Sequence, residues 1–319
     1  MLRWGVIGTG MIAGMFTDDL RLTDSGAMVA VGSRARDTAE RFGEEHGVAN
    51  RHGSYEELVA DPQVDVVYVA TPHPWHLEHA RLALAAGKPV LVEKPLTMNA
   101  VEARELVAAA RESGLFAMEA MWTRFLPHIR EVNCLLAEGA LGEILSVIAD
   151  HGVWFRRDAE HRIFKPELGG GALLDLGVYP VSFASMVLGK PERIVSLVEP
   201  AFTGVDGQSS MIFSYAGGAQ AVLTTNSLAE SPVRAAIVGT QARIEIDRPF
   251  YRPSAFTLIP REGAPRRFEP PHEGNGLRHQ ADEVARCLAE GLRESPLMGL
   301  DESISIMEMI DAVLAGAQC

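Results

Sequence analysis

The sequence predicts an α/β protein in two parts: an N-terminal doubly wound parallel sheet, and a C-terminal α+β domain with a large, mainly antiparallel, open-faced sheet. The first half alternates short apolar strands with amphipathic helices, which is the pattern of a parallel sheet. A glycine-rich turn separates its first strand from its first helix. The second half is a run of strands with few helices between them. We therefore expect one domain over residues 1–120 and a second over residues 121–319.

The composition fits two domains and restricts their partners. With 319 residues, of which 47% are hydrophobic and 22% charged, the chain can bury a sizeable core in each domain. Its net charge of −13 argues against a nucleic-acid partner, which requires a basic face. The N-terminus runs directly into a strand pattern, without room for a signal peptide, and no apolar run approaches the roughly 20 residues that span a bilayer. We expect a cytoplasmic protein without a membrane partner.

The elements of the first half follow one another in a regular order. Each strand is short and apolar, and each helix shows an apolar face. Asp37, with Glu40 three residues later, reads as a capping box that opens the second helix, and Gly114 reads as the end of the last one. The expected strands cover residues 3–8, 27–33, 64–71, 89–95 and 115–120, and the expected helices cover residues 8–20, 37–47, 74–88 and 99–114.

The turn after the first strand carries a dinucleotide-binding fingerprint. Gly8, Thr9, Gly10, Met11 and Ile12, followed by an alanine, give the pattern G-x-G-x-x-A between a strand and a helix. The glycines permit a tight turn and a close approach of the pyrophosphate, whose charge then meets the helix N-terminus. In this position the pattern predicts a Rossmann domain.

The end of the second strand indicates which dinucleotide binds. An NAD site usually offers an acid about 20 residues beyond the fingerprint, to hold the ribose 2′-hydroxyl. Here that region carries Ser33 and Arg34. A hydroxyl and a guanidinium suit a 2′-phosphate, which a carboxylate would repel. We predict NADP(H) in preference to NAD(H).

The second half reads as a different kind of domain. Strand-like segments occupy residues 142–155, 193–202, 208–216, 219–229, 233–240, 243–246 and 255–260, and Gly217 and Gly218 join two of them as a hairpin. Helical patterns occur at residues 172–189, 276–291 and 301–317. These helices are too few to cover both faces of so large a sheet. An uncovered apolar face usually marks an interface, so we expect a homodimer or homotetramer, unless long loops cover the sheet.

Three blocks give the chain a resemblance to a known family. The stretches "GVIGTGMIA", "VYVATPHPWHLEHARLALAAGKPVLVEKPLT" and "GGGALLDLGVY" resemble the glucose–fructose oxidoreductase and inositol dehydrogenase family (Gfo/Idh/MocA) over the whole chain. "MEAMWTRFLP" and the tyrosine at 179 look closest to its branch of dimeric dihydrodiol dehydrogenases and NADP-dependent sugar oxidoreductases. The resemblance implies a catalytic lysine, an acid, and a histidine or tyrosine four residues after the acid, which match Lys94, Asp175 and Tyr179; most members of the family have histidine at the last position. It also implies cofactor contacts at Thr71, Pro72, His76, Glu93, Lys94 and Arg162.

The chemistry of these residues supports the same site without the resemblance. Lys94 lies just past the end of a strand, where open α/β sheets bind ligands. The ordinary pKa of tyrosine, about 10, is too high for a base at neutral pH, but a neighbouring ammonium favours the phenolate. Tyr179 is therefore a credible proton donor and acceptor beside Lys94. Asp175, four residues before Tyr179, shares its helix face and can hold Lys94 charged or orient a substrate hydroxyl. Pro180 lacks an amide for the carbonyl of Leu176 and can bend this helix.

Other residues with reactive or aromatic side chains are assigned less directly. Trp122, Arg124, Trp154 and Phe155, with Arg162, are candidates for the substrate side, although a role in the core is equally consistent with some of them. His73, His76 and His79 cannot all share one helix face, and Cys134, Cys287 and Cys319 form no C-x-x-C pair. We therefore expect no metal site and three reduced thiols.

These observations predict an NADP(H)-dependent oxidoreductase. Its substrate would be a secondary alcohol or carbonyl of a sugar, a polyol or a cyclic trans-diol. The sequence does not separate an oxidising dehydrogenase from a reductase of a dicarbonyl sugar, because the site is reversible. A non-catalytic dinucleotide-binding regulator is the alternative of a different class. We also expect Lys94–Pro95 or Thr71–Pro72 to be a cis peptide, since both lie at strand ends.

Overall fold

The computed structural model describes residues 1–316, which fall into two compact units. The first unit contains residues 1–125 and residues 273–304, and the second contains residues 126–272 and those from Ser305 onward. The sequence suggested an uninterrupted second domain from residue 121. In the structure the chain leaves the second unit after residue 272 and contributes a further segment to the first.

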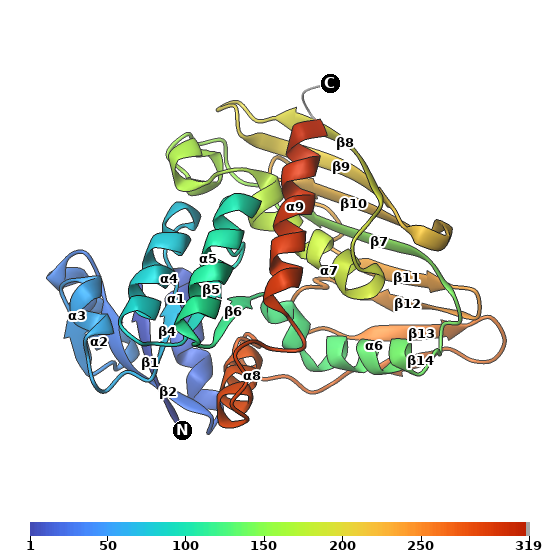
Figure 1. Ribbon diagram of the computed structural model, residues 1–319. Coiled ribbons are helices and arrows are strands. Elements are labelled where there is room, and N and C mark those ends of the chain that lie inside the picture. The colour runs from blue at the N-terminus through green and yellow to red at the C-terminus, as the bar shows by residue number, and fades with distance from the viewer. Residues whose placement is uncertain (317–319) are drawn as a thin grey trace. The chain divides into compact units, whose positions relative to one another are not determined.

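The first unit is built on a six-stranded sheet in the order β3-β2-β1-β4-β5-β6. All of its strand pairs are parallel, so the predicted doubly wound sheet is confirmed (Figure 1). The strands are β1 (Leu2–Ile7), β2 (Gly26–Gly32), β3 (Asn50–His52), β4 (Val66–Val69), β5 (Val90–Glu93) and β6 (Ala117–Ala120). The helices are α1 (Met11–Asp19), α2 (Arg36–His46), α3 (Tyr55–Val59), α4 (His76–Ala85), α5 (Ala100–Ser113) and α8 (Arg278–Ala289).

One helix end differs from the sequence prediction. Gly114 ends α5 in the left-handed conformation, as expected. The capping box at Asp37 was wrong, because α2 begins one residue earlier, with Ala35 as its N-cap and no side-chain cap. The amides of Thr38 and Ala39 both donate to the carbonyl of Ala35. Glu40 instead pairs with Arg36 and Arg51, and Asp37 remains in the first turn, where a negative charge favours the helix dipole.

Asp19, at the end of α1, ties the returning segment to the first unit. Its side chain is 2% exposed. It accepts the amide of Asn275 at 2.9 Å and the amide of Leu277 at 2.7 Å, just before α8. A buried carboxylate that accepts several amides orders the backbone that offers them. Residues far apart in the sequence thus complete the first unit.

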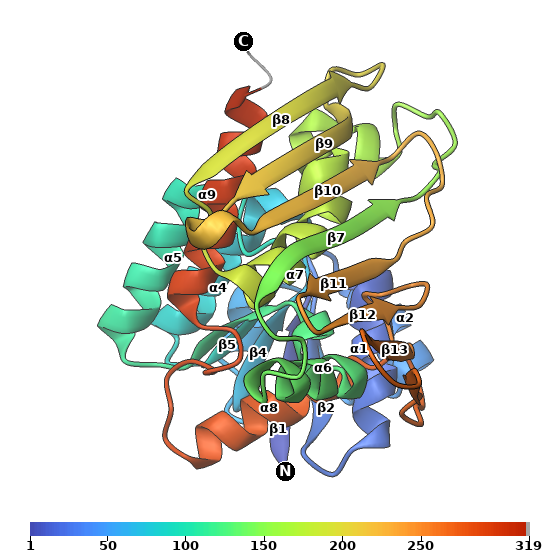
Figure 2. The ribbon, with the colours of Figure 1, turned by 90° about the vertical axis from the view of Figure 1, so that its right-hand side faces the viewer.

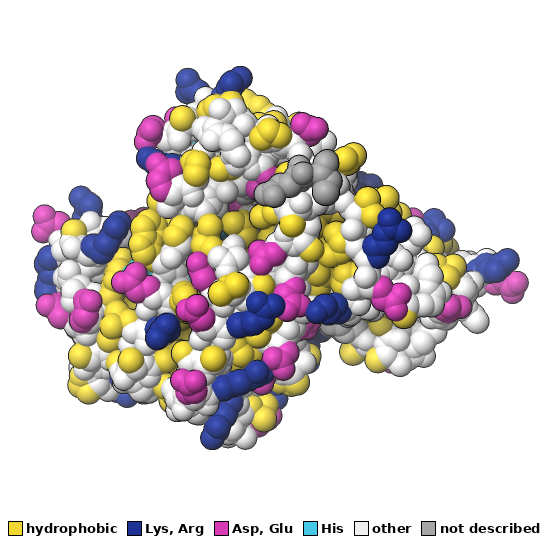
Figure 3. All heavy atoms as spheres, turned by 45° about the horizontal axis from the view of Figure 1, so that its top comes forward, with side chains coloured by type: hydrophobic (Ala, Val, Ile, Leu, Met, Phe, Trp, Pro, Cys, Tyr) yellow, Lys and Arg dark blue, Asp and Glu magenta, His cyan; other side chains and the backbone are white. Residues whose placement is uncertain are grey.

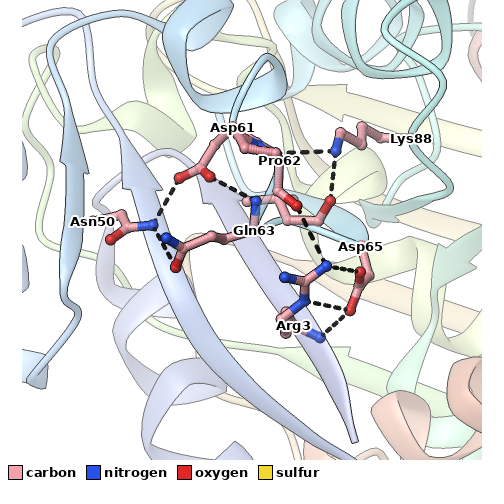
Figure 4. A network of polar contacts seen from close by, with 8 residues as sticks. Arg3, Asn50, Asp61, Pro62, Gln63, Asp65 and Lys88 are labelled. Carbon is pink, nitrogen blue, oxygen red and sulfur yellow. Dashed lines mark hydrogen bonds and ion pairs between the residues drawn. The ribbon is translucent and has the colours of Figure 1, made fainter.

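The amino-terminal edge of the parallel sheet is closed by a polar network (Figure 4). Arg3, near the start of β1, makes an ion pair with Asp65 at 2.6 Å, next to the start of β4. Lys88 donates to the carbonyls of Asp61 and Val64. Asn50 donates to the carboxylate of Asp61 at 2.8 Å. These contacts fix the loop that precedes β4, at the edge opposite to the one that carries the glycine-rich turn.

The second unit is built on an eight-stranded sheet in the order β14-β13-β12-β11-β7-β10-β9-β8. Only the pair of β7 and β10 is parallel among the pairs described for this sheet, so the mainly antiparallel sheet is confirmed. The strands are β7 (Ile144–Gly152), β8 (Arg193–Pro200), β9 (Asp206–Ser214), β10 (Gln220–Asn226), β11 (Ala235–Gly239), β12 (Ala242–Ile246), β13 (Phe256–Pro260) and β14 (Arg266–Phe268). The helices are α6 (Pro127–Ala137), α7 (Val178–Leu188) and α9 (Leu300–Gly316), the last of which begins with residues of the first unit.

One face of this sheet is open and apolar. Figure 2 shows strands β8, β9, β10 and β7 facing the viewer without a helix over them. Val195, Ile212, Val222 and Ile148 are cross-strand neighbours on that face, in a row across the four strands. Each is between 41% and 48% exposed. The opposite face packs on α7, so the predicted open-faced sheet is confirmed.

The helical segment of residues 166–188 corrects one expectation. By length and composition alone it could cross a membrane, whereas the sequence analysis found no such apolar run. Its apolar window is 83% buried, as in the core helix of a soluble protein. Its apolar character is explained by the sheet that it covers.

Charges are mixed on the face of the molecule drawn in Figure 3. On the face drawn in Figure 3, Lys and Arg side chains are interspersed with Asp and Glu. A nucleic-acid interface would instead gather its basic groups into one patch.

Candidate active site

The glycine-rich turn has the geometry that a dinucleotide requires. Gly8 has φ +111, and a Cβ there would lie 2.6 Å from the carbonyl oxygen of Ala70, so only glycine fits. A Cβ on Gly10 would meet nothing within 4 Å, which leaves open space beside the turn. Helix α1 starts at Met11 without a side-chain cap and without an acid in its first turn. Its first amides are therefore suited to an anionic pyrophosphate, and these residues fit the cofactor.

Arg34 follows the carboxyl end of β2 and lies near two aromatic residues. Its guanidinium is 6.0 Å from the centroid of the Trp75 ring. It also lies beside Tyr55, where burial raises the pKa of the phenol and the Arg34 charge opposes that rise. Ser33 precedes it and is 8% exposed. Arg34 itself is exposed, so its charge is held near the strand end and remains available to a ligand.

His76 links the ends of two neighbouring strands. Its side chain is fully buried, and its ring nitrogens lie 2.9 Å from the carbonyl oxygen of Pro95 and 2.8 Å from that of Thr71. Burial lowers the pKa of His76 to about 4. A neutral imidazole donates through one nitrogen only, so at neutral pH one of these carbonyls receives a hydrogen bond. His79 contacts the hydroxyl of Thr71 at 2.9 Å. His76 thus fixes the turns that carry Pro72 and Lys94, and its direct contact with the cofactor stays a prediction.

The Glu93–Lys94–Pro95 segment is held from both sides. Lys94–Pro95 is cis, as predicted, whereas Thr71–Pro72 is not among the cis bonds described. The carboxylate of Glu93 accepts the hydroxyl of Tyr68 and the amide of Lys94. The amide of Leu96 donates to Glu119 Oε1 at 3.1 Å. These hydrogen bonds therefore fix the backbone of Lys94 at the carboxyl end of β5.

The buried carboxyl of Glu119 makes stability depend on pH. Burial raises its pKa from the ordinary 4.5 to about 7. The folded state then binds more protons than the unfolded state between these values, so this contribution to stability is lost as the pH rises through 7. The difference of about 2.5 pH units corresponds to about 3 kcal/mol at most.

We expect Glu119→Gln to flatten this dependence. Between pH 5 and pH 8, Tm of the variant should fall less than Tm of the parent. Glu112→Gln, an exposed change on α5, is the control and should follow the parent. A Glu119→Gln profile parallel to the parent's would show that Glu119 does not titrate in this range.

In the second unit, the glycine run before Asp175 is required by packing. A Cβ on Gly170 would lie 2.8 Å from the carbonyl oxygen of Lys165, and one on Gly171, at φ +130, would collide with the carboxylate of Asp206. Asp206 accepts the amide of Leu173 at 2.6 Å, at the start of the π-helical turn that contains Asp175. Burial raises the pKa of Asp206 to about 6. These glycines therefore let a buried carboxylate reach the turn.

Asp175 is paired with an arginine that the sequence analysis singled out. Arg162 Nη2 donates to Asp175 Oδ2 at 2.9 Å. The carboxylate side chain is 7% exposed and the guanidinium side chain is 53% exposed. Arg162 therefore belongs to the surroundings of the predicted catalytic acid. The structure brings these two predicted residues together.

Tyr179 lies in a cluster with two residues that the sequence analysis missed. The ring centroids of Tyr179 and Tyr251 are 4.7 Å apart, and those of Tyr179 and His151 are 5.2 Å apart. His151 stacks on Tyr251 at 4.3 Å. Asp175 and Tyr179 are 5% and 6% exposed. Asp175 lies in the π-helical turn, and Tyr179 lies in the first turn of α7, which follows it directly.

The remaining candidates are divided between buried and exposed positions. Trp122 and Arg124 are each 4% exposed within the first unit, and Arg124 makes an ion pair with Glu302 at 2.6 Å. Trp154 is 63% exposed, and Phe155 packs on Ile163, Phe164 and Ala201. Their roles toward a substrate stay predictions.

Within residues 1–316 no group of His, Cys, Asp and Glu could hold a metal ion. Cys134 and Cys287 are free thiols, and Cys319 lies outside the described residues.

Comparison with known proteins assigns the family. Residues 2–121 match the profile described as "Oxidoreductase family, NAD-binding Rossmann fold", and residues 129–245 match that of the "GFO/IDH/MocA C-terminal domain". The chain belongs to the Gfo/Idh/MocA oxidoreductase family. Among members of this family, it is 37% identical to the trans-1,2-dihydrobenzene-1,2-diol dehydrogenase of Xenopus tropicalis, over 98% of this chain and 97% of that protein. It is 38% identical to the enzyme of the same name from Bos taurus, over 98% and 96%.

Solved structures share the fold over nearly the whole chain. An aldose–aldose oxidoreductase from Caulobacter crescentus, complexed with glycerol, has a TM-score of 0.90 at 25% identity, covering 99% of this chain and 97% of that one. A 3-ketoreductase from Actinomadura kijaniata, in complex with NADP and TDP-benzene, has a TM-score of 0.84 at 29% identity with the same coverage. The fold class and the predicted family are thus confirmed.

Proposed function

We propose that this protein is an NADP(H)-dependent oxidoreductase. It transfers a hydride between the nicotinamide and a secondary alcohol or carbonyl of a sugar, a polyol or a cyclic trans-diol. Two observations carry the proposal: the first unit has an intact dinucleotide turn, and the second unit carries Asp175 and Tyr179 on one buried helical segment. The substrate class is supported by the names of the relatives, which act on a dihydrodiol or are oxidoreductases of aldoses. In this proposal the N-terminal domain binds the dinucleotide. The C-terminal domain binds the substrate and a second copy of the chain.

The residues of the relay have separate roles. When bound, the nicotinamide supplies or accepts the hydride. In oxidation Tyr179 accepts the proton of the substrate hydroxyl, and in reduction it returns that proton. The Lys94 ammonium favours the phenolate form of Tyr179. Asp175, paired with Arg162, orients a substrate hydroxyl or keeps Lys94 charged. In the ketoreductase relative, a lysine and a tyrosine have each been replaced in separate variants, which supports examining the same residue types here.

The preference for NADP(H) rests on Ser33 and Arg34. Charge-assisted hydrogen bonds contribute on the order of 1.5–3 kcal/mol, so NADPH should bind about tenfold more tightly than NADH or better. Arg34→Ala should remove most of this preference in a fluorescence titration. Arg36→Ala is the matched control, because Arg36 is two residues further and pairs with Glu40. Equal affinity of the parent for the two cofactors would contradict the assignment.

Turnover distinguishes this proposal from a dinucleotide-binding regulator of the same fold. The protein is incubated with NADP⁺ and a panel of aldoses, polyols and a trans-dihydrodiol, and with NADPH and dicarbonyl sugars. Formation or loss of reduced nicotinamide is followed by absorbance. We expect turnover with at least one member of the panel. Tight NADPH binding without turnover of any member would favour the regulator, since a pure sensor needs no proton relay.

The open face of the second unit's sheet is proposed to bind a second copy of the chain. Its exposed row is apolar, and a contiguous apolar face usually marks an interface. Ile212→Glu places a charge in the middle of that row and should yield a monomer in sedimentation at micromolar concentration, where the parent forms a dimer or tetramer. Val101→Glu changes an apolar residue that is 60% exposed on α5 and should leave assembly intact. A monomeric parent would contradict the proposal.

A further inference from the structure

Pro180 leaves a gap in the hydrogen bonding of the helical segment that carries Asp175 and Tyr179. An α-helical residue at 180 would donate its amide to the carbonyl of Leu176, and proline has no amide to donate. The π-turn Leu173–Gly177 ends directly before α7, where Pro180 lies in the first turn. The Val178 amide is directed at the Leu176 carbonyl oxygen, and a carbonyl has room for a second donor.

His151 supplies that donor from a different element. Its Nδ1 lies 3.1 Å from the carbonyl oxygen of Leu176. Since a carbonyl only accepts, Nδ1 must carry the hydrogen, which fixes the tautomer of a neutral imidazole. The side chain is 1% exposed. His151 lies near the end of β7 and has Thr225 of β10 as its neighbour in the sheet, so the donor is carried by an inner strand of the sheet.

The same imidazole also contacts the predicted catalytic phenol. Its ring stands 5.2 Å from that of Tyr179, and it stacks on Tyr251, which in turn stands 4.7 Å from Tyr179. The hydroxyl of Thr225 donates to the backbone carbonyl of His151 at 3.0 Å, and also reaches that of Ala172 at the start of the turn. The His151 side chain therefore contacts both the Leu176 carbonyl, three residues before Tyr179, and the ring of Tyr179 itself.

We propose that His151 is a positioning residue: its Nδ1–H replaces the amide that Pro180 lacks and thereby holds Asp175 and Tyr179 in their reactive arrangement. The inference rests on the proposed function of Tyr179 for its effect on turnover. Misplacing a catalytic group by about 1 Å can cost on the order of 10²-fold in rate. Loss of this donor should therefore lower kcat by roughly ten- to a hundredfold and leave KM and NADPH affinity nearly unchanged.

Replacements that place a donor differently test the inference. The amide nitrogen of asparagine can occupy the place of Nδ1, whereas that of glutamine reaches toward the place of Nε2, and leucine has no donor. We expect His151→Asn to keep most of the parent's kcat, and His151→Gln and His151→Leu to lose it. Pro180→Ala restores a backbone amide for Leu176. Added to His151→Gln or His151→Leu, it should recover at least half of the loss on a logarithmic scale, while Pro180→Ala alone stays near the parent.

Hydrogen exchange gives a readout that does not depend on catalysis. Amides of residues 173–182 should exchange faster in His151→Gln than in His151→Asn, and Pro180→Ala should reverse the change. Equal kcat and equal exchange in the Asn and Gln variants would overturn the inference, as would failure of Pro180→Ala to rescue either property. If His151→Leu does not fold, the comparison of Asn with Gln decides. If Tyr179→Phe keeps the parent's turnover, the proposed relay fails, and the exchange pattern still decides the role of His151.

Discussion

Tyr179→Phe is expected to lower turnover by roughly 10²–10⁴-fold, the usual contribution of general acid–base catalysis. The change removes one oxygen from a side chain that is 6% exposed, so its aromatic contacts with His151 and Tyr251 are kept. Affinity for NADPH should barely change, because the phenol is assigned to the substrate. Measurement of kcat at saturating cofactor and substrate tests the expected loss of turnover. A value within about threefold of the parent, well below that range, would reduce Tyr179 to a packed phenol.

Tyr179→His is the informative control. Imidazole can pass the same proton, so partial activity should return. Histidine titrates near 6.5 and tyrosine near 10 when unperturbed. The pH optimum for oxidation should therefore move downward relative to the parent. An inactive Tyr179→His variant that binds NADPH normally would indicate that geometry, and not proton transfer alone, requires the phenol.

Lys94→Ala is expected to be at least as damaging as Tyr179→Phe. It removes the ammonium that favours the phenolate, and it alters the segment at the end of β5 where the nicotinamide is proposed to bind. Both kcat and the affinity for the cofactor should fall, which separates this variant from Tyr179→Phe. Lys190→Ala is the control, because Lys190 is a surface lysine paired with Glu308. Retention of the parent's kcat by Lys94→Ala would remove Lys94 from the mechanism.

Much of the fold follows from local sequence patterns. The alternation of apolar strands and helices predicted the parallel sheet, since each element has its own hydrophobic period. The start of α2 could not be assigned in this way, because Glu40 forms ion pairs with Arg36 and Arg51 rather than a capping box. The glycine run at 169–171 stands in one of the stretches that carry the family resemblance. Its packing against Asp206, 35 residues beyond Gly171, depends on tertiary structure.

The candidate site was predictable where residues lie in motifs. Gly8, Gly10, Lys94 and Asp175 stand in recognisable stretches, and the pairing of Arg162 with Asp175 brings two predicted residues together. His151 is a single histidine in a strand, without a motif around it. The signal that could have identified it is indirect: Pro180 leaves the Leu176 carbonyl without its α-helical donor, so a side chain can donate in that place. Sequence alone does not say from which strand that donor comes.

The transfer of deuterium from labelled NADPH tests the central claim most directly. Both hydrogens on C4 of the nicotinamide are replaced by deuterium, and the protein is given a carbonyl substrate identified by the panel. We predict that mass spectrometry finds one deuterium on the carbinol carbon of the product, and that Tyr179→Phe gives the same label at a greatly reduced rate. Two results would contradict hydride transfer by this protein: a product that contains no deuterium, or labelled NADPH that binds to the protein and is not consumed.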